Sequence, residues 1–288
     1  MFSPVVGTES VEKVLKRRGV TIETRGNVQD ILLPLDRELP LSGEQCNEFR
    51  RLFSKSSFRK AIRRITSGGG SATVKQLTKI AGGQTENYID FLLDIGVAEQ
   101  AGSVVTLTRP INNIGPTLEW YVADVFNKDF SGSAAWSVNL SDFRYGDYDI
   151  LAWLPPILVY VETKSSRPPE VKDSELRRFL QRGVELAPEL AILLIDTEDD
   201  LTGFIRRLFD LMLPTVRANN GISDPEWRHD EKPFIAPQAR YPGISFGYRR
   251  FYVTNSQPSI RRQLSKCLRH YHSEVKDGGD SANFVLEI

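Results

Sequence analysis

The chain has few of the residues that build disulfide-bonded or zinc-clustered domains. It contains two cysteines, Cys46 and Cys267, and three histidines among 288 residues. Two distant cysteines do not form a disulfide scaffold, and their scarcity is typical of a reducing cytoplasm. The histidines, His229, His270 and His272, all lie late in the chain. So few cysteines and histidines, without a spaced cluster, exclude a Cys/His zinc site.

Net charge and long apolar runs are also missing. Lysine plus arginine and aspartate plus glutamate each total 37, so any nucleic-acid surface must be a local patch. No apolar run approaches membrane-spanning length, and Met1–Lys16 lacks an uninterrupted signal-peptide core. The chain has no nucleotide-binding glycine loop, so we expect no ATPase activity of its own. We expect a soluble, cytoplasmic protein with no membrane partner.

A chain of this length can form one large or two medium domains. We expect three parts. Residues 1–49 carry no pattern to which a role can be assigned. Residues 50–112 form a small domain, and residues 113–288 form a larger one. The larger domain contains an irregular insertion at about 215–248, which is rich in proline, glycine and mixed charge.

The small domain shows a specific order of elements. Three short helices are predicted at about Ser57–Thr66, Val74–Ala81 and Gln84–Ile95. A hairpin is predicted at Val97–Gln100 and Val104–Thr108, with a turn at the glycine between them. Three helices followed by a hairpin resemble a winged helix-turn-helix, which implies contact with DNA.

The charges of this domain depart from the usual DNA-binding pattern. The third helix normally enters the major groove, but here it carries Glu86, Asp90 and Asp94 and no lysine or arginine. Docking to a protein and a purely architectural role therefore stay open beside DNA contact. The basic residues lie on the first two helices and on a C-terminal helix that starts at Pro258. The candidate DNA-binding residues are Arg59, Lys60, Arg63, Arg64, Lys75, Arg261, Arg262 and Arg269.

A hairpin in the larger domain carries the main functional signal. Two apolar runs, Ile150–Leu154 and Ile157–Val161, flank Pro155-Pro156. Runs of this length that are broken by prolines predict two buried strands joined by a tight connection. If Leu154 faces Ile157, the register of the whole hairpin follows, and a slip of one residue would turn every side chain to the other face.

Charged residues stand at the open end of this hairpin. Counting back along the register places Asp149 opposite Glu162, and Lys164 shares a face with Glu162 because side chains alternate with period two. Two carboxylates and an ammonium would thus meet beside buried strands, where charges are stable only if they pair or hold a metal. The alternative is two solvated strand ends with ordinary surface charges.

A helix before the hairpin adds a third acid. Gly115-Pro116 opens the helix, and Glu119 borders its apolar stripe. A first-turn glutamate stabilised by the helix dipole is the alternative explanation. A strand at 134–140, the hairpin, a helix at 173–187 and a strand at 189–197 complete the order.

This order of helix, three strands, helix and strand resembles the PD-(D/E)xK nuclease superfamily, with Glu119, Asp149 and Glu162-Thr163-Lys164 as the matching residues. The resemblance covers about Gly115–Thr197 and departs at Tyr148, where the motif has proline. It implies an α/β fold with a restriction-endonuclease-like mixed sheet flanked by helices. The smaller winged-helix α+β domain would precede it.

The resemblance also implies a chemistry. Asp149, Glu162 and the backbone carbonyl of Thr163 would hold Mg²⁺, with Mn²⁺ as a substitute, and Glu119 would hold a second ion or an outer-shell water. Lys164 would orient or help to deprotonate the attacking water and stabilise the developing charge. Gln181, in the following helix, is a candidate contact near the site.

The sequence therefore predicts a metal-dependent DNA endonuclease that a winged-helix module positions, in DNA processing or in defence against mobile elements. A separate ATPase or targeting subunit is a candidate partner, and a homodimer would suit two cuts. Two other classes stay open. One is a non-catalytic DNA- or protein-binding scaffold, and the other is a winged-helix transcriptional regulator.

Overall fold

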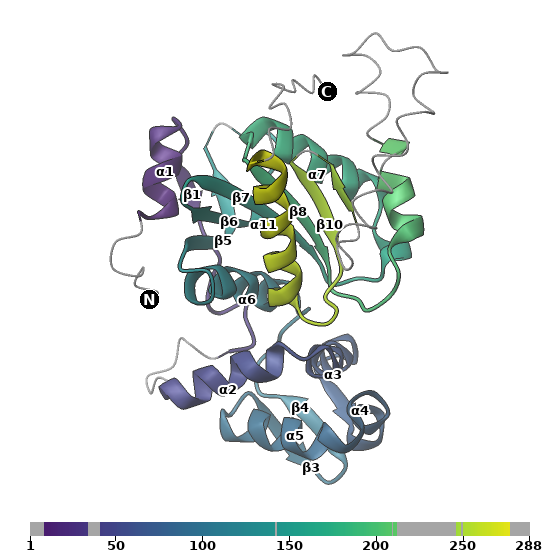
Figure 1. The fold of residues 1–288 in the computed structure, drawn as a ribbon. Coiled ribbons are helices and arrows are strands. Elements are labelled where there is room, and N and C mark those ends of the chain that lie inside the picture. The colour runs from purple at the N-terminus through teal and green to yellow at the C-terminus, as the bar shows by residue number, and fades with distance from the viewer. Residues whose placement is uncertain are drawn as a thin grey trace. The chain divides into compact units, whose positions relative to one another are not determined.

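The computed structural model describes residues 9–33, 41–141, 143–208, 210–211, 246–248 and 250–276 (Figure 1). The chain forms two compact units. The first combines residues 1–25 with 123–288, and the second spans Gly26–Val122. The division falls inside helix α6 (Gly115–Lys128). The sequence had placed domain boundaries at 49/50 and 112/113, and the predicted insertion at 215–248 lies outside the described residues except for 246–248.

The first unit is built on a seven-stranded sheet with the order β1-β5-β6-β7-β8-β10-β9. Pairing is antiparallel from β1 to β7, parallel from β7 through β8 to β10, and antiparallel again at β9. The predicted mixed sheet is therefore confirmed. The strands are β1 (Ile22–Thr24), β5 (Ser133–Leu140), β6 (Tyr148–Leu154), β7 (Ile157–Lys164), β8 (Leu190–Ile195), β9 (Phe246–Tyr248) and β10 (Phe251–Thr254).

Helices cover both faces of this sheet. Phe251 and Val253 of β10 join a buried cluster with helix α7 (Asp173–Leu186) and with helix α1 (Val11–Arg17). The alternating residues Tyr252 and Thr254 contact helix α11 (Ile260–Lys276), which Figure 1 shows in yellow across the sheet. Because successive strand residues point to opposite faces, α7 and α11 lie on opposite sides. A 3-10 turn, η2 (Pro168–Glu170), precedes α7, and residues 202–208 and 210–211 are helical.

The hairpin β6–β7 has the predicted register. Leu154 pairs with Ile157, Ile150 pairs with Val161, and Pro155-Pro156 forms the turn. Most of its residues are buried because β7 has neighbouring strands on both sides and helices above and below. A strand buried on both faces reads as a continuous apolar run, which is why the run in the sequence predicted it.

The N-terminal segment 1–49, to which the sequence assigned no role, is divided between the units: residues 1–25 belong to the first unit and 26–49 to the second. Strand β1 pairs with β5 at the edge of the large sheet, and Val11 and Leu15 of α1 are buried in the same cluster as α7. A three-residue strand has too few positions to show an alternating pattern, and its partner lies more than a hundred residues away. Only the folded chain could reveal this pairing.

The second unit combines helices with a three-stranded antiparallel sheet in the order β2-β4-β3. The three predicted helices and the hairpin are confirmed with small shifts at their ends, and β2 is a strand that the sequence did not predict. The elements are α2 (Gly43–Phe53), α3 (Ser56–Ser67), β2 (Ser71–Thr73), α4 (Val74–Ala81), the 3-10 turn η1 (Gly82–Gln84), α5 (Thr85–Asp94), β3 (Ala98–Ala101) and β4 (Val104–Leu107).

Aromatic side chains form the core of the second unit. Phe58 lies edge-on to Tyr88 with 5.0 Å between ring centroids, and Phe49 stacks on Phe53 at 5.4 Å. Trp120 lies edge-on to Phe49 at 5.8 Å. Such pairs add about 0.5–1.5 kcal/mol beyond the burial of their surface.

Across the described ranges of both units, no helix is at once long enough and apolar enough to cross a membrane.

Gly132, which precedes β5, tests how tightly the first unit is packed. A Cβ atom at this position would stand 2.5 Å from Leu154 Cδ2 and 2.9 Å from the backbone oxygen of Trp153. Because backbone cannot move aside cheaply, we expect Gly132→Ala to lower the free energy of unfolding by about 1–3 kcal/mol. Urea denaturation checks this. Gly203→Ala is the control, because nothing lies within 4 Å of that Cβ. Because Gly203 is in a helix, Gly203→Ala should raise the free energy of unfolding by up to about 1 kcal/mol. Equal changes in the free energy of unfolding for the two variants would contradict the prediction.

Candidate active site

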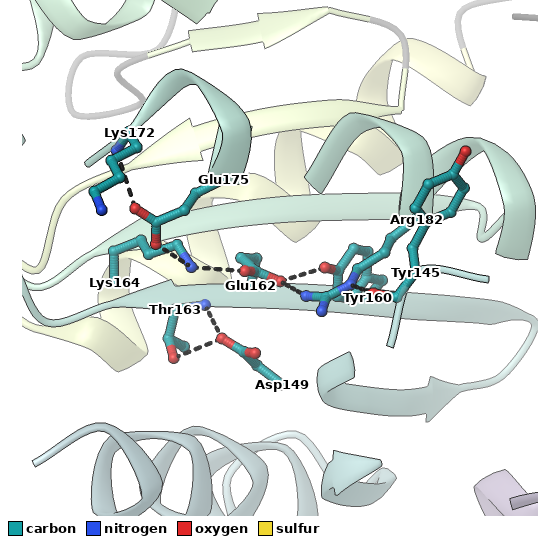
Figure 2. A network of polar contacts seen from close by, with 9 residues as sticks. All are labelled: Tyr145, Asp149, Tyr160, Glu162, Thr163, Lys164, Lys172, Glu175 and Arg182. Carbon is teal, nitrogen blue, oxygen red and sulfur yellow. Dashed lines mark hydrogen bonds and ion pairs between the residues drawn. The ribbon is translucent and has the colours of Figure 1, made fainter. Parts of the chain in front are cut away.

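Glu162 and Lys164 meet at the C-terminal end of β7. They are two residues apart on one face of the strand, and Lys164 Nζ donates to Glu162 Oε1 at 2.8 Å (Figure 2). Glu162 is only 2% exposed, and the Lys164 side chain is 16% exposed. A carboxylate with so little access to water requires partners that supply positive charge or hydrogen bonds.

Helix α7 and a strand neighbour supply those partners. Arg182 Nη1 donates to Glu162 Oε2 at 2.8 Å, and the Tyr160 hydroxyl donates to the same oxygen. Glu175 Oε1 lies 3.3 Å from Lys164 Nζ. Burial raises the pKa of Tyr160 far above its usual value, so the phenol keeps the proton that it donates. Both oxygens of Glu162 therefore accept hydrogen bonds, Oε1 from Lys164 and Oε2 from Arg182 and Tyr160.

The sequence of α7 explains why it reaches the strand in two places. Glu175 and Arg182 are seven positions apart, which is close to two helical turns, so they project from the same side of the helix. Leu176 and Phe179 are buried in the cluster that includes Tyr160 and bring this side onto the sheet. Glu175 also accepts a hydrogen bond from the backbone nitrogen of Lys172 at 3.0 Å, which satisfies a donor at the start of the helix.

Asp149 binds the residue between the pair. Its Oδ2 accepts hydrogen bonds from the backbone nitrogen of Thr163 at 2.8 Å and from Thr163 Oγ1 at 3.1 Å. Figure 2 shows Asp149 beside Thr163, apart from the line of Glu162 and Lys164. The three charged residues thus gather at one end of the hairpin, as predicted. The Asp149 carboxylate, however, turns to a side chain on the other face of β7.

The charges of this site act on one another. Burial raises the pKa of Asp149, the charge of Glu162 raises it further, and Lys164, the Thr163 N–H and Arg182 lower it, with a result of about 7. Burial lowers the pKa of Lys164, but Glu162 and Asp149 outweigh this, and the pKa is raised. Lys164 therefore carries its proton at neutral pH, and Asp149 is close to its midpoint.

The donor set of the site is compatible with a hard cation. Within the described part of the chain, no group of three or more histidine, cysteine, aspartate or glutamate side chains could hold a metal ion. Mg²⁺, however, is usually held by one or two carboxylates, with water and substrate phosphate as the other ligands. A cation near Asp149 and Glu162 would relieve the repulsion that raises the pKa of Asp149. This pair of carboxylates fits such an ion.

Two more site residues were predicted, Glu119 and Gln181. Glu119 is half-buried in α6 and belongs to the second unit. Gln181 is half-buried in α7, but the contact to Glu162 is made by its neighbour, Arg182. The sequence did not predict roles for Arg182, Glu175 or Tyr160. An arginine three residues after Phe179, on the apolar side of an amphipathic helix, was the signal that could have pointed to Arg182.

One of the candidate DNA-binding residues is wrongly assigned. Arg59 is 0% exposed, and its Nη1 donates to the backbone oxygen of Phe53 at 2.6 Å, so it cannot reach a phosphate. It lies on the buried side of α3 with Phe58 and Ile62, and its guanidinium satisfies a carbonyl at the end of α2. The other candidates are exposed or half-buried: Lys60, Arg63, Arg64, Lys75, Arg261, Arg262 and Arg269.

Comparison with known proteins gives distant likenesses. No protein-family model matches the chain, and no curated protein sequence matches it. Protein VC1899 from Vibrio cholerae is similar over 71% of this chain and 56% of its own length, with 12% identity and a TM-score of 0.45. The restriction endonuclease FokI is similar over 54% of this chain and 40% of its own length, with 14% identity and a TM-score of 0.23. The chain thus spans little more than half of the first protein. TM-scores below 0.5 do not establish a common fold or function.

The raised pKa of Asp149 predicts how stability changes with pH. A carboxyl group whose pKa rises on folding, here from 3.8 to about 7, binds its proton more tightly in the folded state. Its contribution to stability is complete below the unfolded value and is lost as the pH rises through the folded value. In wild type this loss is roughly 1.4 kcal/mol per pH unit between the two values, and Asp149→Asn removes it.

Urea denaturation in EDTA between pH 4 and 8 measures this effect. The stability of Asp149→Asn relative to wild type should increase with pH over the interval between 3.8 and about 7 and then level off. Asp147→Asn is the matched control, because Asp147 is exposed two residues earlier. Curves for wild type and Asp149→Asn that stay parallel would show that folding leaves the Asp149 carboxyl group unperturbed.

Proposed function

We propose that the first unit is a metal-dependent deoxyribonuclease of the PD-(D/E)xK type, which hydrolyses phosphodiester bonds of DNA. The observation that carries this proposal is the end of the β6–β7 hairpin. There Lys164 contacts Glu162 at 2.8 Å, and burial together with the charge of Glu162 raises the pKa of Asp149 on the neighbouring strand. An acid pair and an ammonium at a strand end form the set that this chemistry uses.

The order of elements supports the same assignment. Helix α6 is followed by β5, β6 and β7, then by α7 and β8, and this is the helix, three-strand, helix and strand order of the restriction-endonuclease-like fold. Strands β7 and β8 are parallel, so their C-terminal ends lie at one edge of the sheet. In open α/β sheets, ligands bind outside the C-terminal ends of such strands.

Each residue of the site has a role in this proposal. Asp149 and Glu162 would hold Mg²⁺, which when bound neutralises phosphate charge and makes water a stronger nucleophile. Thr163 orients the Asp149 carboxylate through two hydrogen bonds. Lys164 keeps its proton because the neighbouring carboxylates raise its pKa. We therefore assign it the stabilisation of negative charge that develops on phosphorus oxygens, and the orientation of water, but not the role of general base.

The second unit is proposed to position the nuclease. Its order of α3, β2, α4, α5, β3 and β4, with a three-stranded sheet, supports the winged-helix assignment. Helix α5, which corresponds to the groove-reading helix, exposes Glu86, Asp90 and Asp94. We propose that DNA contacts come instead from the basic residues of α3 and α4. We also propose that the protein works in DNA processing or in defence against mobile elements. It would do so with a partner that has ATPase or targeting activity, or as a homodimer.

A non-catalytic binding protein is the second candidate function. It is favoured by the burial of Glu162, whose two oxygens already accept hydrogen bonds from Lys164, Arg182 and Tyr160. A carboxylate satisfied in this way can serve the fold alone. The two candidates differ in one measurable property, which is cleavage of DNA.

Cleavage assays on supercoiled, linear duplex and single-stranded DNA with Mg²⁺ or Mn²⁺ test the proposal. We expect wild type to cut, and EDTA to stop it. Asp149→Asn, Glu162→Gln and Lys164→Ala should each lower the rate at least about 100-fold, because each removes charge that the transition state needs. Asp147→Asn should cut like wild type.

Thermal melting shows whether each variant is folded. Unchanged nicking by folded Glu162→Gln and Lys164→Ala would contradict the catalytic assignment. Binding of DNA by wild type without cleavage, and without sensitivity to these substitutions, would favour the non-catalytic function.

Helix α11 is proposed to bind the DNA backbone beside the site. It follows β10, which is parallel to β7, so its first turn lies at the edge of the sheet that carries Lys164. Arg262 and Arg269 are exposed on this helix. We expect Arg262→Ala and Arg269→Ala to weaken DNA binding for all sequences. Each should also reduce the slope of log affinity against log salt by about one.

Binding titrations at several salt concentrations measure that slope. Arg177→Ala is the control, because Arg177 is exposed on α7, on the opposite side of the sheet. Equal slopes for wild type and both α11 variants would remove this helix from the DNA interface.

A further inference from the structure

Four charged side chains form a line of alternating sign through the site. Glu175 lies 3.3 Å from Lys164, Lys164 lies 2.8 Å from one oxygen of Glu162, and Arg182 lies 2.8 Å from the other oxygen. The two inner members come from β7 and the two outer members from α7 (Figure 2). Helix α7 therefore contacts both residues of the proposed catalytic pair, one from each end.

Arg182 is itself firmly held. It is 6% exposed, and its Nε donates to the backbone oxygen of Tyr145 at 2.9 Å. Its guanidinium carbon lies 5.7 Å from the centre of the Tyr148 ring, a distance suited to a cation–π contact. A planar fork with fixed neighbours can hold a carboxylate in one orientation, which a lysine with its single rotating ammonium does less well.

The two carboxylate oxygens of Glu162 therefore have different partners. Arg182 and Tyr160 occupy Oε2, which leaves Oε1 to Lys164. Without Arg182, the carboxylate could rotate, and the Glu162 side chain, which is 3% exposed, would lose a charged partner. The orientation of Glu162 thus depends on a residue that lies on its far side from Lys164.

We propose that Arg182 is a positioning residue of this site, which holds Glu162 through Oε2 so that Oε1 stays beside Lys164 for the metal and the reaction. This inference rests on the proposed nuclease function. In this role Arg182 acts through Glu162, whose Oε2 it contacts. Residues of this kind behind a metal ligand typically change metal affinity or activity by about 10–100-fold when they are replaced.

The test compares Arg182→Gln, Arg182→Lys and wild type in two measurements. The first is the affinity of the full chain for Mn²⁺ without DNA, measured by calorimetry. The second is steady-state DNA cleavage. For Arg182→Gln we expect about 10–100-fold weaker Mn²⁺ binding and a similar loss in kcat, with KM for DNA unchanged. Arg182→Lys keeps the charge but loses the fork, so its losses should be smaller yet measurable.

Arg178→Gln is the matched control. Arg178 lies one turn earlier on α7 and is exposed, so this variant should bind Mn²⁺ and cut DNA like wild type. A purely structural role of Arg182 would lower the melting temperature without weakening Mn²⁺ binding by the folded protein. If Arg182→Gln does not fold, Arg182→Lys, which keeps the buried positive charge, decides the question.

The outcomes separate this inference from the function on which it rests. Wild type that neither binds Mn²⁺ nor cuts DNA overturns the proposed function, and the role of Arg182 falls with it. If wild type is active and folded Arg182→Gln keeps the Mn²⁺ affinity and kcat of wild type, only the positioning role is overturned. If Arg182→Gln does not fold, the same result for folded Arg182→Lys overturns that role.

Discussion

The charge of Glu162 is the constraint on which the rest of the first unit depends. A carboxylate with 2% exposure, inside a sheet covered by helices on both faces, loses nearly all of its hydration. The fold must replace that hydration with cations and hydrogen bonds from several elements. Strand β7 supplies Lys164 and Tyr160, and helix α7 supplies Arg182. The contact that Arg182 makes to compensate the buried charge of Glu162 therefore also holds α7 against the sheet.

This dependence links stability to the proposed chemistry. A buried ion pair adds little net stability compared with apolar packing, but loss of one partner is costly because it leaves a charge without compensation. Asp149, at the same end of the hairpin, has the opposite situation: burial and the charge of Glu162 raise its pKa to about 7. A site with one fixed carboxylate and one that is poised to lose its proton is suited to accept a cation.

The apolar pattern predicted the hairpin and its register correctly. Ile150–Leu154 and Ile157–Val161 are short and uninterrupted, and Leu154 pairs with Ile157 across the prolines. Local patterns were less informative where a partner is distant. Strand β1 pairs with β5 through three residues, and Arg59 was predicted to bind DNA because it is one of the basic residues of the first two helices, although it is buried. Its position on the buried side of α3 agrees with the helical period of Phe58 and Ile62.

The sequence by itself determined that Asp149, Glu162 and Lys164 gather at one end of a hairpin, because period-two alternation and a tight turn set the register locally. Only the tertiary structure decided their partners. Arg182 reaches Glu162, and Glu175 reaches Lys164, because α7 packs on the sheet with one particular side inward. Asp149 turns to Thr163 because a backbone donor and a hydroxyl are available there. These contacts join segments whose relative placement depends on packing across the whole sheet, which no local pattern records.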